Sequence, residues 1–182
     1  MGLRLRLEEG HHLFFVTTTV VDFIKIFTSD EYCQILIQNL DFYRQIYNFK
    51  IIAYVIMPNH IHLILWPQES RDLPKIMRDF KKYTSVEVRR LLENEKNSKI
   101  LYLLRRSARG YKNQKYKLWM DRYDRLAIYS AQVLSQKMEY IHYNPVRARL
   151  VKQGIDWKYS SARNYCLDDH SILKVDNDIV SF

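Results

Sequence analysis

The sequence predicts an α+β protein, because segments with strand character and segments with helical periodicity follow one another along the chain. A strand pattern at 12–21 precedes a helical pattern from residue 29, and two more strand patterns precede a second long helical pattern. With 182 residues, of which 47% are hydrophobic, the chain is long enough for one domain with a real core.

The first two segments are a strand and a packing helix. The strand at 12–21 is rich in aromatic and β-branched residues, among them Phe14, Phe15 and three threonines in a row. Ser29 and Asp30 then open the helical pattern, in which apolar residues recur at spacings of three and four. If the strand lies beside the strand of His60, its polar groups can reach the same site.

Two further strands, 50–56 and 59–66, are predicted on either side of a turn at Met57-Pro58-Asn59. His60 and His62 stand at i and i+2 on the second strand, so their side chains share one face, while Ile61 and Leu63 point to the other face and into a core. Two imidazoles on one face can bind a divalent cation. The pair fits equally well two unrelated strand histidines that form ordinary hydrogen bonds.

The second helix is predicted at about 73–92, with an apolar stripe that must pack on the sheet. The basic residues Arg78, Lys82 and Arg89 cluster on its opposite side. Glu87 falls inside the apolar stripe. Because a carboxylate that faces a core is costly unless it is paired or bound to a cation, Glu87 requires a partner.

These observations define a candidate metal site. If the second helix covers the face that carries His60 and His62, Glu87 can be the third ligand, and Tyr83 lies one helical turn away from it. Two imidazoles, one carboxylate and open positions suit Mg²⁺ or Mn²⁺ with a bound phosphate. For Tyr83 alone, the alternative is an ordinary amphipathic packing residue at a helix edge.

The charge balance predicts a polyanionic partner, because 29 Lys and Arg residues stand against 20 Asp and Glu residues and give a formal charge of +9. No apolar run approaches the roughly 20 residues that span a bilayer, and no basic amphipathic helix with a large apolar face dominates the chain. Nucleic acid is therefore favoured over a membrane. Residues 1–10 alternate Leu and Arg and do not resemble a signal peptide, so we expect a cytoplasmic protein. Cys33 and Cys166 are interpreted as ordinary thiols.

Residues 94–99 are predicted to form a loop, and a basic region with interleaved tyrosines follows it. Cations that track phosphates and rings that stack on bases are typical of single-strand binding, although a solvated loop fits almost as well for any one residue. The candidate DNA-binding residues of this region are Arg105, Arg106, Arg109 and Lys112, with Lys115 and Lys117 close by.

The C-terminal part is predicted to be a helical extension. Residues 118–129 return to the sheet with Trp119 buried, and a helix at 131–143 ends at Asn144-Pro145 because proline disfavours helix at the preceding residue. Arg147 and Arg149 belong to a second basic surface, which we expect to contact DNA together with Arg78 and Lys82. We predict one domain over residues 1–169, with its helical part at about 131–166, and a tail at 170–182.

The motifs together resemble a known family. His60-Ile61-His62 after Met57-Pro58-Asn59, with a tyrosine downstream on the basic helix segment 80–84, resembles the single-tyrosine HUH (histidine-hydrophobic-histidine) transposases of bacterial insertion sequences. The later stretch Tyr-Ile-His-Tyr-Asn-Pro-Val-Arg-Ala at 140–148, followed by Trp-Lys-Tyr-Ser-Ser-Ala-Arg at 157–163, is similar to the branch of REP-associated tyrosine transposases. The resemblance covers about residues 11–165.

The resemblance implies a ferredoxin-like α+β fold, with an antiparallel sheet and helices packed on one face, that acts on single-stranded, often hairpin-associated DNA. It assigns His60 and His62 as metal ligands, Glu87 as the third ligand and Tyr83 as the nucleophile. The expected activity is metal-dependent cleavage and strand transfer through a 5′-phosphotyrosine, with Mg²⁺ or Mn²⁺. The resemblance also implies a bacterial, nucleoid-associated protein in the cytoplasm. Relatives commonly have glycine where Arg149 stands.

Two other functions fit the same sequence. The chain can be a retired or host-adopted module that binds single-stranded or hairpin DNA without cleaving it, or an HUH endonuclease of the replication-initiator or relaxase kind. The presence of all expected side chains favours the enzyme, and the C-terminal motifs favour the transposase. The DNA sequence, the native metal and the choice between monomer and homodimer are left open by the sequence.

Overall fold

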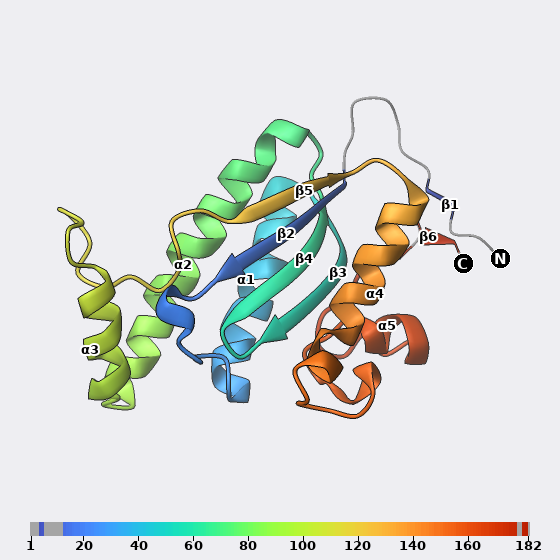
Figure 1. Ribbon diagram of the computed structural model, residues 1–182. Helices are drawn as coiled ribbons and strands as arrows, with labels where there is room; N and C mark the ends of the chain where they lie inside the picture. Colours follow the sequence, from blue (N-terminus) through green and yellow to red (C-terminus); the bar gives the residue numbers. More distant parts are fainter. Residues whose placement is uncertain (1–3, 6–12, 178–179, 182) are drawn as a thin grey trace.

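A four-stranded antiparallel sheet forms the centre of the computed structural model, which describes residues 4–5, 13–177 and 180–181 (Figure 1). Its strand order is β3-β4-β2-β5, the order of a ferredoxin-like fold, so the predicted fold class is confirmed. The strands are β2 (Leu13–Thr19), β3 (Lys50–Met57), β4 (His60–Trp66) and β5 (Asp124–Ile128). A separate two-stranded pair joins β1 (Arg4–Leu5) to β6 (Val180–Ser181).

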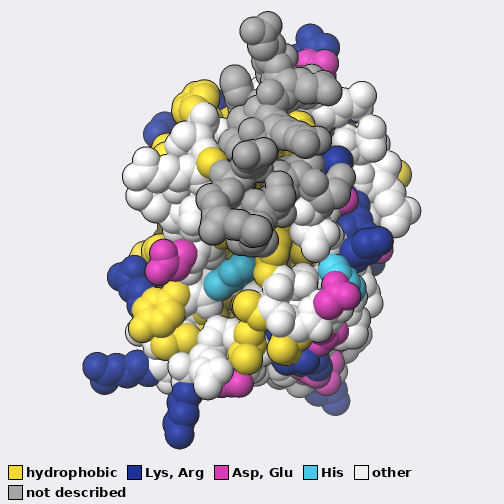
Figure 2. Space-filling model, turned by 90° about the vertical axis from the view of Figure 1, so that its right-hand side faces the viewer, with side chains coloured by type: hydrophobic (Ala, Val, Ile, Leu, Met, Phe, Trp, Pro, Cys, Tyr) yellow, Lys and Arg dark blue, Asp and Glu magenta, His cyan; other side chains and the backbone are white. Residues whose placement is uncertain are grey.

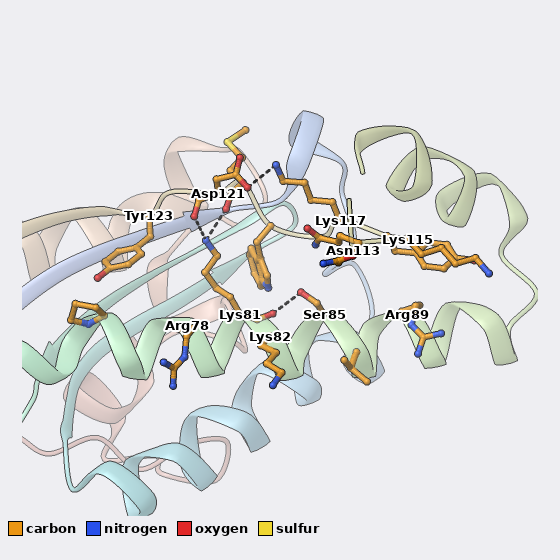
Figure 3. Close-up of a pocket in the computed structure, with 16 residues that line it drawn as sticks. Arg78, Lys81, Lys82, Ser85, Arg89, Asn113, Lys115, Lys117, Asp121 and Tyr123 are labelled. Carbon is orange, nitrogen blue, oxygen red and sulfur yellow. Dashed lines mark hydrogen bonds and ion pairs between the residues drawn. The ribbon is translucent and has the colours of Figure 1, made fainter. Parts of the chain in front are cut away.

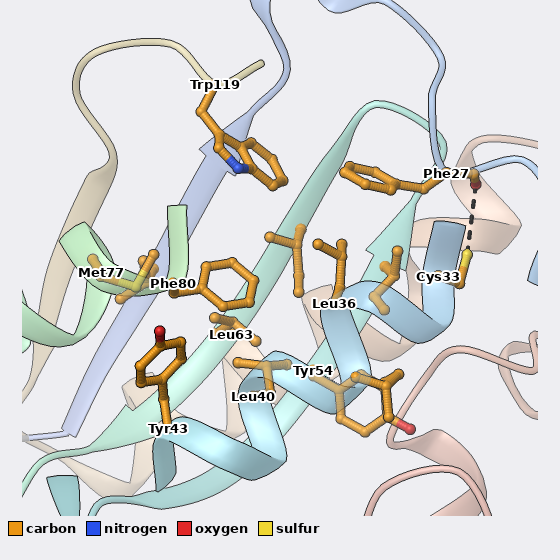
Figure 4. Close-up of a cluster of buried hydrophobic side chains, with 14 of the residues drawn as sticks. Phe27, Cys33, Leu36, Leu40, Tyr43, Tyr54, Leu63, Met77, Phe80 and Trp119 are labelled. Atoms are coloured by element: carbon orange, nitrogen blue, oxygen red, sulfur yellow. Dashed lines mark hydrogen bonds between the residues drawn. The ribbon is translucent and has the colours of Figure 1, made fainter. Parts of the chain in front are cut away.

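Helices α1 (Asp30–Tyr47) and α2 (Leu73–Asn94) cover one face of this sheet and enclose the larger core. Leu63 of β4 points into this core, where Leu36 and Leu40 of α1 and Phe80 of α2 surround it (Figure 4). The alternation of side chains along β4 makes this possible, because every second residue faces the helices. The described residues contain no helix that is both long and apolar enough to cross a membrane.

Helix α4 (Ala131–Arg147) packs on the opposite face of the sheet, beside β3 (Figure 1). Leu134, Met138 and Ile141 of α4 form a second core with Val55 of β3 and Ile64 of β4. The expected C-terminal extension is therefore present, and it covers the face that α1 and α2 leave open.

A motif downstream of α4 closes the outer edge of β3. The backbone amide of Ile56 donates to the carbonyl of Tyr159 at 2.9 Å, and the indole N–H of Trp157 donates to the carbonyl of Ile56, also at 2.9 Å. The short helices η1 (Val21–Phe23), η2 (Ser70–Asp72), η3 (Gly154–Asp156) and α5 (Ala162–Leu167) complete the described elements. The Trp-Lys-Tyr-Ser-Ser-Ala-Arg stretch at 157–163 thus has a structural role, because it forms hydrogen bonds with the outer edge of β3.

Helix α3 (Ser98–Ser107) lies where we predicted a loop and a basic region. The side chain of Asn97 caps its first turn by accepting from the amide of Ile100 at 3.2 Å, and Leu104 is buried. Asn is a preferred N-cap residue, so the turn at 95–97 is short and the helix begins directly after it.

Helix α4 continues past Pro145, where we predicted its end. Proline lacks an N–H and its ring crowds the carbonyl four residues earlier, but the helix continues because the amide of Ala148 still donates to the carbonyl of Asn144 at 3.0 Å. The extra turn is decisive for the site, because it keeps Asn144 and Arg147 on the helix.

The segment that we predicted to be a tail packs against the domain in its described part. Leu173 and Val175 are buried, and the backbone of Ile51 exchanges two hydrogen bonds with Asp176, at 2.8 and 2.9 Å. Two apolar residues at alternate positions are enough to hold such a short irregular segment on the edge of β3.

The core predicts the effect of truncating α1. Replacing Leu40 with alanine is expected to lower the free energy of unfolding by about 2–5 kcal/mol, because a fully enclosed side chain leaves a cavity. Phe42→Ala, two residues away but 57% exposed, is expected to cost less than about 1 kcal/mol. Urea unfolding followed by circular dichroism measures both, and equal losses would contradict the described packing of α1.

Candidate active site

His60 and His62 lie side by side on the face of the sheet that carries α4, with their ring centroids 4.7 Å apart. Both lie at the start of β4, and only 4% of His62 is exposed. Burial lowers the pKa of His60, and burial together with the charges of His60 and Lys137 lowers the pKa of His62 to about 3. Both imidazoles are therefore neutral at physiological pH, which is the form that binds metal ions.

The inner ring nitrogens of the two histidines face oxygen atoms. The Nδ1 atom of His62 lies 2.8 Å from the hydroxyl of Thr17 on β2, so the first strand does contribute a polar group to this site. The Nδ1 atom of His60 lies 2.7 Å from the side-chain oxygen of Asn59. With the proton on Nδ1 in both rings, Nε2 keeps its lone pair, which is the usual arrangement behind a metal-binding histidine.

Helix α4 brings a tyrosine and an asparagine to the same place. The ring of Tyr140 lies 5.1 Å from the ring of His62, and the amide nitrogen of Asn144 lies 3.3 Å from its Nε2. These two residues are four apart and share one side of the helix. The ring of Phe15 contacts both His62 and Tyr140 and separates the site from the second core.

Two cations of α4 flank Tyr140. The Lys137 ammonium lies 5.7 Å and the Arg147 guanidinium 5.8 Å from the centre of its ring. Both positive charges stand where they can attract a phosphate and stabilise negative charge on an attacking oxygen. Figure 2 shows the side of the molecule that carries α4 and α5, where Lys and Arg side chains project at the lower edge.

A buried network fixes α4 on β3. The Nε2 atom of His142 lies 2.9 Å from the hydroxyl of Ser161, and the amide of Tyr54 donates to the same hydroxyl at 3.0 Å. Burial lowers the pKa of His142 to about 4, so this ring is a neutral packing residue. The network fixes the position of α4 relative to β3, and therefore the position of Tyr140.

The prediction that Tyr83 and Glu87 join the histidines is wrong for this structure. Both residues line a groove between α1 and α2, on the opposite face of the sheet. Glu87 has its partner there, since Asn39 donates an amide N–H to its carboxylate at 3.0 Å. Tyr83 packs its ring 5.8 Å from that of Tyr43. The amide of Asn39 is thus the partner of Glu87, and the ring of Tyr43 is the packing partner of Tyr83, where we had expected a metal site.

The physical reason is the alternation along β4. Helix α2 packs on the face to which Ile61 and Leu63 point, so it cannot also cover the face of His60 and His62. Among the described residues, no group of three or more His, Cys, Asp or Glu side chains is arranged to hold a metal ion. The Asn144 side chain, which contacts His62 through its amide, also carries an amide oxygen of the kind that suits Mg²⁺ or Mn²⁺.

The predicted DNA-binding residues are distributed over both faces. Arg147 belongs to the histidine face, whereas Arg78 and Lys82 line a groove between α2 and residues 113–123. Arg149 has φ +57°, the left-handed conformation that explains the glycine expected there. The remaining predicted residues are exposed at the end of α3 or in the turn after it, and they are Arg105, Arg106, Arg109 and Lys112.

Sequence reasoning missed Tyr140 and Asn144 as site residues, although it singled out the motif that contains them. Their spacing of four on a helix, with Lys137 one turn earlier and Arg147 one turn later, was the available signal. Ending the helix at residue 143 removed Asn144 from it and concealed the pattern.

Comparisons with known proteins identify the family. A family model described as IS200-like transposase matches residues 11–144. Over 123 residues the chain is 28% identical to a protein assigned as a REP-associated tyrosine transposase in Haemophilus influenzae, covering 63% of this chain and 60% of that protein. Over 115 residues it is 29% identical to the REP-associated tyrosine transposase of Escherichia coli K12, covering 62% and 54%.

The aligned part thus spans less than two thirds of each of these relatives. A solved structure of a REP-associated tyrosine transposase bound to a REP hairpin superposes with a TM-score of 0.64 and 23% identity. That alignment covers 100% of this chain and 95% of the other, so the two proteins share the fold.

The buried state of His142 predicts a pH dependence of stability. An unfolded histidine has a pKa of about 6.5, and the folded value is about 4, so below pH 6.5 the unfolded state takes up a proton that the native state does not. The free energy of unfolding therefore falls as the pH drops, and this histidine contributes about 1–2 kcal/mol of the loss by about pH 5. Urea titrations at about pH 7.5 and pH 5 should give a smaller pH-dependent loss for His142→Gln than for the wild type. The same loss in both proteins would contradict the buried neutral imidazole.

Proposed function

Because this chain belongs to the IS200-like transposase family, we propose that it cleaves single-stranded DNA and transfers the strand through a covalent bond to Tyr140. The observation that carries the proposal is the contact of Tyr140 and Asn144, on one helix, with His62 on the sheet. Tyr140 replaces Tyr83 as the proposed nucleophile, since Tyr83 lies on the other side of the sheet.

The proposed substrate is DNA that contains a hairpin next to a single strand. The formal charge of +9 supports a polyanionic substrate. The structural relative was solved with a REP hairpin, which supports a hairpin for this chain as well. Cations of α4 at the mouth of the site suit the phosphates of a strand that enters beside Tyr140.

We propose that His60, His62 and Asn144 hold a divalent cation, Mg²⁺ or Mn²⁺. Two neutral imidazoles and one amide oxygen fit such an ion, and the hydrogen bonds of Thr17 and Asn59 occupy the Nδ1 atoms and not the Nε2 atoms. The Asn144 amide, whose nitrogen lies 3.3 Å from Nε2 of His62, would turn over to present its oxygen to the ion. When bound, the cation supplies Lewis-acid polarisation of the scissile phosphate.

The protein residues account for the remaining chemistry. The Tyr140 oxygen attacks phosphorus, the new oxygen–phosphorus bond replaces the bond to the DNA 3′-oxygen, and that oxygen takes up the proton lost by the phenol. The 5′ end stays on the protein, and the free 3′-hydroxyl leaves. Attack by a 3′-hydroxyl reverses the step, so a phosphodiester is exchanged for another without nucleotide hydrolysis. Lys137 and Arg147 stabilise the charge that develops on the attacked phosphate.

Replacing the proposed nucleophile tests the function directly. Tyr140→Phe is expected to abolish the covalent protein–DNA adduct, because the ring is kept and only the attacking oxygen is lost. Tyr83→Phe is the matched control and should form the adduct at the wild-type level. Labelled hairpin DNA with a single-stranded flank, incubated with Mn²⁺ and separated on a denaturing gel, measures both.

Loss of the adduct in Tyr83→Phe, with Tyr140→Phe still active, would restore the original assignment and overturn this one. Binding of DNA without any adduct, across several metals and hairpins, would favour the second candidate, a DNA-binding module without cleavage activity.

The metal assignment has its own test. Asn144→Ala and His62→Ala are each expected to weaken Mn²⁺ binding at least about tenfold, because each removes a ligand. Glu87→Gln should leave the affinity unchanged, since that carboxylate contacts Asn39 on the other face. Isothermal titration calorimetry with Mn²⁺ alone gives the affinities, and a loss confined to Glu87→Gln would refute the assignment.

A further inference from the structure

A second basic site lies away from the histidines. A groove of about 800 Å³ runs between α2 and the segment 113–123 that leads into β5 (Figure 3). Its lining includes six Lys and Arg residues and one acidic residue, Asp121. The cations are Arg78, Lys81, Lys82, Arg89, Lys115 and Lys117.

The single acid of the groove does not neutralise it. Asp121 already pairs with the buried ammonium of Lys117 at 2.8 Å. Lys81 donates to the backbone carbonyls of Met120 and Asp121, at 2.7 and 2.9 Å, and forms no ion pair of its own among the described contacts. The groove therefore carries a local excess of positive charge, which concentrates anions.

The cations of α2 are arranged in a row. Arg78, Lys82 and Arg89 follow one side of the helix, with Ser85 between them, and their backbone positions span about 16 Å along its axis. The ion pairs that Arg78 and Arg89 form with Asp79 and Glu93 are near the surface, so they are weak and exchange readily with a phosphate. A row of this kind suits an extended chain of phosphates.

Aromatic rings stand on the facing wall. The ring of Tyr116 lies within 5.9 Å of the charged groups of Arg89, Arg105 and Lys115, and Tyr123 lies at the other end of the groove. Cations that follow a backbone, together with rings on which bases stack, are the combination that binds single strands. The bases of a duplex stack on one another and do not offer their faces to such rings, so the groove suits a single strand.

The position of the groove connects it to the candidate active site. Tyr123, at one end of the groove, directly precedes Asp124 of β5. Asp124 pairs with Thr17 of β2, whose hydroxyl contacts His62. A strand that leaves the groove at Tyr123 therefore needs only to cross the edge of β5 to reach the face of Tyr140.

We propose that this groove binds the single-stranded DNA that flanks the cleaved phosphodiester, which rests on the proposed function for the identity of the ligand. The groove acts as a holding site on the far side of the edge strand. The histidine face then receives the phosphate to be cleaved from the same strand.

The test compares two triple variants of equal charge change. Lys82→Gln, Arg89→Gln and Lys115→Gln together remove groove cations, and Lys25→Gln, Lys152→Gln and Lys174→Gln together remove exposed cations elsewhere. Both are made in a Tyr140→Phe background, and circular dichroism checks that they are folded. Fluorescence anisotropy with a fluorescein-labelled single strand of mixed sequence, and with its duplex, gives affinities at several salt concentrations.

The groove variant is expected to bind the single strand on the order of tenfold more weakly, with a salt slope shallower by about two, because three phosphate contacts are lost. The control variant should keep most of the affinity. Equal losses in both variants, an unchanged affinity in the groove variant, or an equal loss for the duplex would each overturn the proposal. If the triple variant is unfolded, the double variant Lys82→Gln and Lys115→Gln, both exposed, is measured in its place.

Failure of the proposed function gives a different result. In the protein with Tyr140 intact, absence of any covalent adduct together with a groove-dependent affinity would reject cleavage and keep the groove. A normal adduct with a groove-independent affinity would reject the groove and keep cleavage.

Discussion

The alternation of side chains along β4 is the constraint on which the rest of the structure depends. Ile61 and Leu63 point to the face on which α1 and α2 pack. His60 and His62 therefore point to the other face. A register shift of one residue would exchange the two sets and place imidazoles in the apolar core. Whatever side chains complete the histidine site must therefore come from an element on the second face, and α4 is the helix that packs there.

The C-terminal motif makes α4 a precise support for the site. The segment around Tyr159 extends the sheet past β3, and Ser161 ties that edge to His142, two residues from Tyr140. The hydroxyl of Ser161 also accepts a hydrogen bond from the backbone amide of Tyr54. The position of α4 is therefore fixed relative to the backbone of the sheet. The proposed nucleophile is thus positioned by buried hydrogen bonds and not only by its exposed neighbours.

Much of the fold could be predicted from the sequence, because strand and helix patterns at 13–94 are strong and local. Of the candidate site, the two histidines could be predicted, whereas the residues from α4 could not. The spacing of His60 and His62 fixes their common face. A carboxylate on an apolar stripe, such as Glu87, indicates only that it has some partner, and the amide of Asn39 provides one as well as a cation would. The contact of Asn144 with His62 joins residues 82 positions apart, and no local pattern encodes which helix crosses which face.

The two faces of the sheet meet at β5, which within the described residues pairs with β2 and has no strand on its other side. Such an edge is usually protected by charge, and here the exposed residues Arg122 and Arg125 are cations. The positive charge of Arg122 and Arg125 both discourages pairing with another strand and attracts a phosphate chain. Because Arg125 shares the face of the groove while Asp124 shares the face of Thr17, the edge changes from positive to negative across its thickness. Under the proposed function, a DNA strand that crosses this edge would pass from the groove cations to the cations of α4, Lys137 and Arg147, which flank Tyr140.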